Sequence, residues 1–128
     1  MSFAPVSAWR RFDAWFHAPV PGARLGAFRA LVCGVALYDV LLYAGVVLTD
    51  AANVSAGAQG RPWAPLYLFQ VLGVRPIGID AAHALQAVAI VSLVCGALGI
   101  ASRLSCAVAA IAFYAWTGFA YSFGKPHH

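Results

Sequence analysis

The sequence predicts an all-α, helical multi-pass membrane protein with three transmembrane helices and an amino-terminal interfacial helix. Hydrophobic residues make up 62% of the 128 residues, and charged residues only 9%. A soluble domain has about 25% charged residues, so a soluble fold of this size could not cover its surface. Three apolar runs are each long enough to cross a bilayer, for which about 20 residues suffice. The length allows one membrane domain.

Residues 7–18 predict a helix that lies in the membrane interface. At helical spacing Trp9, Phe12 and Phe16 share one face, while two adjacent arginines fall elsewhere. Pro19 ends the pattern. The region lacks the continuous apolar core and the small-residue cleavage site of a signal peptide.

The first transmembrane helix is predicted at 25–48. As a helix these residues rise about 36 Å, enough to cross a hydrocarbon core of about 30 Å. Their leucine, valine and phenylalanine side chains contribute about −5 kcal/mol to insertion, whereas a central Asp costs about 2.5–3.5 kcal/mol. Arg29 lies near the start and can extend its charge to the interface. The balance predicts an inserted helix that carries Asp39 at mid-depth.

A long loop is predicted at 49–79, because glycine and proline recur through it. Within this loop, residues 62–73 are apolar but too short to span. Their aromatic residues are typical of a re-entrant or interfacial segment, or of a lid over the bundle.

Two further transmembrane helices are predicted at 83–101 and 104–123. A tight turn at Ser102 and Arg103 joins them, so they should form an antiparallel hairpin. The second span carries small residues at helical spacing, which allow another helix to approach closely. This small-residue stripe consists of Ala89, Ser92, Gly96 and Gly99.

The patterns of charged residues and of cysteines bear on the protein's partners, its orientation in the membrane and its metal or disulfide sites. The eight basic residues are scattered, so the net charge of +4 predicts membrane topology and no nucleic-acid partner. Arginine excess on one side predicts a cytoplasmic amino terminus. Cys33, Cys95 and Cys106 lie in apolar runs without C-x-x-C spacing, and we interpret them as small buried hydrophobic residues. No disulfide or metal site is predicted.

Asp39 is the strongest functional candidate, because an acid inside a membrane helix is expensive to keep. The alternative is a structural contact with Arg29, or with a Tyr or Trp on another helix. Arg29 lies ten residues earlier. That separation is about 15 Å along a helix, so the two side chains cannot pair within this helix.

A second constellation follows the last span: Lys125, His127 and His128. These residues offer a cation, a base and ring nitrogens near the membrane surface. The alternative is an interfacial anchor or a loop. The sequence has no G-x-S-x-G motif, phosphate-binding glycine loop or paired carboxylates, so nothing predicts hydrolysis or phosphoryl transfer of the soluble type.

Two motifs together resemble a known family. PGARLGAFRALVCGVALYDVLL, at 21–42, places Pro, Leu and Phe-Arg at the start of a long apolar helix, and YSFGKPHH, at 121–128, follows a later helix. In this order they resemble the amino-terminal part of HTTM proteins. These are bacterial membrane proteins similar to the transmembrane region of the vitamin K-dependent gamma-carboxylase. The resemblance implies a bacterial inner-membrane location.

The same resemblance implies that the chain is a fragment, since family members are longer and continue into further helices. We therefore expect an incomplete bundle that leaves the small-residue stripe with few partners. Such a bundle should associate with itself or with the missing carboxyl-terminal portion, and with membrane lipid. The alternative account of the terminal His127-His128 is a shortened affinity tag. Carboxylase activity is not implied, because Lys125 does not clearly match the family's lysine base.

Three functions stay open at this point. The first is an HTTM-type module that binds a lipid or quinone between its helices. The second is a membrane anchor subunit that binds haem or quinone for a redox partner, with His83 and the terminal histidines as its only axial ligands. The third is an inactive structural fragment. No residue pattern identifies a cofactor or decides whether the protein is an enzyme.

Overall fold

The computed structural model describes residues 22–58 and 62–123. Within them the chain forms α2 (Gly22–Leu42), α3 (Ala44–Ser55), α4 (Tyr67–Val71), α5 (Ile79–Leu98) and α6 (Ser102–Ser122). Three of these helices, α2, α5 and α6, are long and apolar enough to cross a membrane. The predicted all-α, multi-pass membrane fold is therefore confirmed. The interfacial helix predicted at 7–18 lies outside the described residues.

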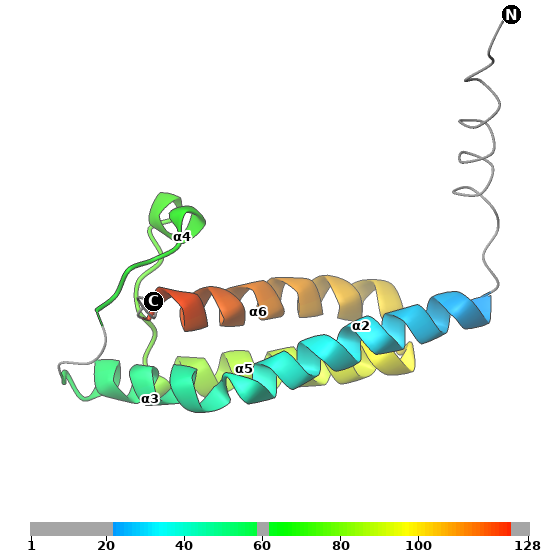
Figure 1. The fold of residues 1–128 in the computed structure, drawn as a ribbon, viewed down its shortest axis with the longest axis horizontal. Helices are drawn as coiled ribbons and strands as arrows, with labels where there is room; N and C mark the ends of the chain where they lie inside the picture. The colour runs from blue at the N-terminus through cyan, green and yellow to red at the C-terminus, as the bar shows by residue number, and fades with distance from the viewer. Residues whose placement is uncertain (1–21, 59–61, 124–128) are drawn as a thin grey trace, which may run out of the picture.

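The three long helices lie side by side (Figure 1). The start of α2 and the α5–α6 turn lie at one end of this bundle, and α3, α4 and the end of α6 lie at the other (Figure 1). We call these the turn end and the α3 end. The tight α5–α6 turn therefore lies at one end of the bundle, and the segments that connect α3, α4 and α5 lie at the other.

The first predicted span, 25–48, differs from the structure at its end. Helix α2 stops at Leu42, but Tyr43 keeps an αR backbone, and the Tyr43 N–H donates to the Asp39 carbonyl at 3.1 Å. Helix α3 then continues to Ser55. The loop predicted at 49–79 is therefore wrong over residues 49–55. Hydropathy falls there, but no proline or glycine interrupts the helix before Gly57, whose φ of +63° ends it.

The hairpin also differs in its boundaries. Helix α5 begins at Ile79, earlier than the predicted 83, because no helix breaker follows Gly78 and the acidic Asp80 is favourable in the first turn. The turn lies at Gly99 and Ala101, which have φ of +81° and +44°, and not at Ser102 and Arg103, which belong to α6. A left-handed glycine after the last helical residue is the usual way to end a helix.

The small-residue stripe is where α2 and α6 pack on α5. Ala89, Ser92 and Gly96 are buried. A Cβ on Gly96 would lie 3.3 Å from the Cys33 sulfur of α2, and a Cβ on Gly99 would lie 2.7 Å from an Arg29 nitrogen. The expectation that the stripe has few partners is therefore wrong. Small side chains let the helix backbones approach closely, which gives apolar helices their dispersion contacts in lipid.

The outer surface of the bundle is apolar. Only 11% of the most hydrophobic window of α2 is buried in the molecule. Phe28, Leu31 and Tyr38 are each about two-thirds exposed, at 65%, 66% and 67%. Contiguous exposure of this kind is typical of a surface covered by lipid, where it carries no hydrophobic penalty.

Candidate functional site

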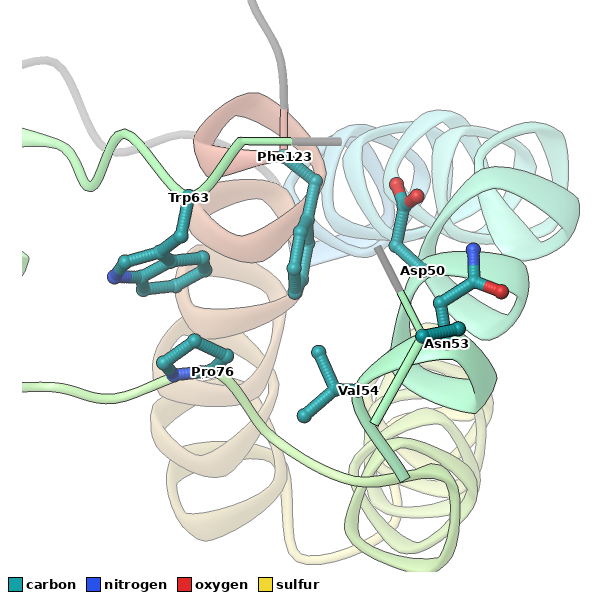
Figure 2. A pocket seen from close by; sticks show the side chains of 7 residues that line it. Asp50, Asn53, Val54, Trp63, Pro76 and Phe123 are labelled. Atoms are coloured by element: carbon teal, nitrogen blue, oxygen red, sulfur yellow. The ribbon is translucent and has the colours of Figure 1, made fainter. Parts of the chain in front are cut away.

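A small cavity of about 90 Å³ lies at the α3 end of the bundle. Helix α3, the segments on both sides of α4 and the end of α6 line it (Figure 2). The lining residues are Asp50, Asn53, Val54, Ala58, Trp63, Pro76 and Phe123. We call this the Asp50 cavity.

The continuation of α3 past the apolar run places two polar side chains in this cavity. Asp50 and Asn53 are three residues apart, so they share one helix face. The Asp50 side chain is buried, with 4% of its surface exposed, whereas Asn53 is half-buried. Among the described residues, the other buried polar side chains are the serines Ser92, Ser105 and Ser122, so Asp50 is the buried residue that can carry a charge.

Aromatic rings form the opposite wall. In Figure 2 the Phe123 ring stands between Trp63 and the Asp50 side of the cavity. The Trp63 and Phe123 ring centroids are 4.9 Å apart at 62°, an edge-on contact. The Trp63 ring also lies 5.9 Å from that of Phe119. Edge-on packing of this kind adds about 0.5–1.5 kcal/mol beyond the burial of area, so this wall is held firmly.

Backbone and hydroxyl hydrogen bonds fix the segment that carries Trp63. The Ala64 N–H donates to the Ser122 carbonyl at 2.9 Å, next to an antiparallel bridge between Trp63 and Phe123. The Leu66 N–H donates to the Ser122 hydroxyl at 3.3 Å, and that hydroxyl donates to the Gly118 carbonyl at 2.6 Å. Ser122 is fully buried and thereby ties the loop before α4 to the end of α6.

The chemistry of the cavity follows from these groups. An ionised Asp50 accepts hydrogen bonds, and the Asn53 amide both donates and accepts them. The aromatic faces of Trp63 and Phe123 attract cations. A volume of about 90 Å³ is several times that needed for one water molecule, so a small polar group fits. The cavity therefore suits a small cation or a hydrogen-bond donor.

Asp39 lies elsewhere. It is half-buried near the end of α2, one turn before Tyr43, and does not line the cavity. The Tyr43 hydroxyl is close enough to interact with both Asp39 and Tyr121, and the two tyrosine ring centroids are 6.1 Å apart. The structure thus brings Asp39 toward a pair of tyrosines.

Arg29 lies at the turn end, away from both acids. Its guanidinium packs over Gly99 at the end of α5, where unpaired helix carbonyls favour a positive charge. Its Nε is buried and has no hydrogen-bond partner among the described residues.

Lys125, His127 and His128, the other predicted site residues, lie outside the described residues. His83 is exposed on the first turns of α5 and lines neither of the two hollows described in this section.

Sequence reasoning missed Asp50, because the fall in hydropathy placed it in the predicted loop. One signal could have found it: the i, i+3 spacing of Asp50 and Asn53 in a stretch without a helix breaker.

A second hollow, an open apolar groove of about 420 Å³ between α5 and α6, faces outward beside Val91, Cys95 and Leu104. No family model, curated protein or solved structure matches this chain.

Proposed function

We propose that this protein is an HTTM-type integral membrane module that binds the amine headgroup of a membrane lipid in the Asp50 cavity. The observation that carries the proposal is a buried carboxylate that lines a small cavity together with the aromatic side chains of Trp63 and Phe123, at one end of a transmembrane bundle. The bacterial inner membrane, with the amino terminus in the cytoplasm, is the location that we propose with it.

The charge and size of the cavity favour an ammonium group. A carboxylate attracts a primary or quaternary ammonium and repels a phosphate, and the rings of Trp63 and Phe123 add cation–π attraction. A volume of about 90 Å³ accepts a headgroup amine but no sugar or ring system. The acyl chains of the same lipid would lie on the apolar outer surface of the helices, so the amine reaches the cavity from the membrane interface.

A quinone fits less well. Its ring system is too large for a cavity of about 90 Å³, and its uncharged carbonyl oxygens gain no attraction from a carboxylate. Haem iron is held by His, Cys, Met or Tyr side chains, and none of these is among the residues that line the cavity. A redox anchor is therefore not the function that this cavity favours.

Native mass spectrometry of the purified protein in detergent tests the proposal. Phosphatidylethanolamine and phosphatidylglycerol with identical acyl chains are added in equal amounts, and the bound fraction of each is measured. We expect preferential binding of phosphatidylethanolamine. Asp50→Asn should weaken that binding roughly tenfold or more, as expected for the loss of a hydrogen bond to a charged group.

Asp80→Asn is the matched control, because it removes the same charge from an exposed residue of α5. It should leave the preference unchanged. Equal binding of the two lipids, preferential binding of phosphatidylglycerol, or an equal effect of both variants would each overturn the amine-headgroup proposal.

A further inference from the structure

Two cysteines from different transmembrane helices meet over a glycine of a third. A Cβ on Gly96 of α5 would lie 3.3 Å from the Cys33 sulfur of α2 and 3.6 Å from the Cys106 sulfur of α6. The two thiols are close enough to interact with each other. Cys33 is only 6% exposed. Because Gly96 has no side chain, the sulfur atoms of Cys33 and Cys106 both lie close to the position that its Cβ would occupy.

A cation stands beside this pair. Arg29 lies one helical turn before Cys33 on α2 and acts on it electrostatically. The Arg29 Nε is buried and has no hydrogen-bond partner among the described residues. A buried nitrogen donor without a partner is expensive, and a nearby negative charge would satisfy it.

We propose that Cys33 and Cys106 form a two-coordinate binding site for a soft monovalent metal cation, the class to which Cu(I) belongs. Thiolates are the ligands that such ions prefer. No group of three or more His, Cys, Asp or Glu residues suited to a metal gathers in the described part of the chain. A metal that accepts two ligands therefore fits this pair better than one that needs four, such as zinc.

Charge balance supports a monovalent ion. On binding, each S–H bond loses its proton to solvent and each sulfur bonds to the metal, so two protons are released and nothing is oxidised. Two thiolates and one monovalent cation together carry one net negative charge. The Arg29 guanidinium compensates that charge, which lowers the penalty for burying the complex inside the membrane. This inference is independent of the Asp50 cavity.

The test is a titration of the fully reduced protein in detergent with Ag(I), a redox-inert probe, against a competing chelator. We expect one silver ion per chain. Cys33→Ala and Cys106→Ala should each abolish this binding. Arg29→Gln should weaken it roughly 10- to 100-fold, the usual effect of removing a group that supports a metal ligand.

Cys95→Ala is the matched control, because Cys95 lies next to Gly96 in sequence but lines the outward groove. It should bind silver as the parent does. Binding that is absent from the parent, or that depends equally on Cys95, would overturn the proposal.

X-ray absorption of the Cu(I)-loaded parent tests the same site without a variant, so its result does not depend on whether the cysteine variants fold. Two sulfur ligands and no nitrogen or oxygen ligand are expected. Any other ligand set would overturn the two-thiolate site without use of a variant.

Discussion

At the residue scale, Gly118 is the described glycine at which a side chain would have the least room. A Cβ on Gly118 of α6 would overlap the Phe69 ring, with Cε2 at 2.9 Å and Cε1 at 3.0 Å. Phe69 is the buried residue of α4, and its ring centroid lies 5.2 Å from that of Phe119. The absence of a side chain at Gly118 therefore lets the short helix α4 dock on α6.

Gly118→Ala should displace Phe69 and destabilise the protein by about 1–3 kcal/mol, the usual effect of overpacking. Gly34→Ala is its control, because a Cβ at Gly34 meets nothing within 4 Å. Alanine also has the higher helix propensity, by about 1 kcal/mol, so Gly34→Ala should be neutral or stabilising. Thermal unfolding in detergent compares the two variants. A Gly118→Ala protein that unfolds at the parental midpoint would contradict this packing.

Substitution by leucine should destabilise the protein to different extents at Asp39 of α2 and at Asp50 of α3. Asp50 is 4% exposed and has interaction partners that its removal would strand, so Asp50→Leu should cost about 1–3 kcal/mol. Asp39 is half-buried and interacts electrostatically with Tyr43, so Asp39→Leu should cost less than about 1 kcal/mol. Equilibrium unfolding in mixed detergent measures both. Equal losses would show that burial does not distinguish these carboxylates.

At the scale of elements, α5 depends on a side chain from another helix for its start. Gly78, which precedes α5, offers no side-chain cap. The Ile79 N–H instead donates to the hydroxyl of Ser55, at 2.8 Å, from the last turn of α3. The same hydroxyl lies 2.9 Å from the position of a Cβ on Gly78, so a glycine is needed for this approach.

Ser55→Ala should therefore loosen the first turn of α5 and cost about 0.5–2 kcal/mol, as for the loss of an N-cap. Amide hydrogen exchange should rise at Ile79 and its neighbours. Thr49→Ala is the control, because the Thr49 hydroxyl donates to the Gly45 carbonyl of its own helix at 2.7 Å. If amide exchange at Ile79 is unchanged in Ser55→Ala, the Ser55 hydroxyl does not stabilise the start of α5.

At the scale of the whole molecule, the arrangement of the helices predicts the relative sidedness of three positions. Ala23, near the start of α2, and Ser102, at the turn, lie at one end of the bundle, and Ala56 lies beyond α3 at the other end (Figure 1). Single cysteines at these positions, in a background without the three native cysteines, should be treated with an impermeant reagent on intact cells.

Cysteines at Ala23 and Ser102 should label from the same side, and a cysteine at Ala56 from the opposite side. The reason is that α2 crosses the membrane once between the first and the third of these positions. Labelling of Ala23 and Ala56 from one side would exclude the three-span arrangement.

The sequence by itself determined the class of the protein and the number of its long apolar helices. Both depend on hydropathy summed over about 20 residues, so an error at any one residue has little weight. The tight hairpin was also predictable, because the second and third spans follow each other almost without a connection. The exact turn, at Gly99 and Ala101, was not, since local sequence defines helix ends only to within a few residues.

Only the tertiary structure decided where the polar residues lie. Asp39, the strongest candidate from the sequence, is half-buried one turn before Tyr43, whereas Asp50, placed in a loop from the sequence, is only 4% exposed. The meeting of Cys33 and Cys106 over Gly96 had no signal in their spacing. The physical reason is the same in each case: burial depends on which helix faces meet, and that is decided by packing between segments distant in sequence.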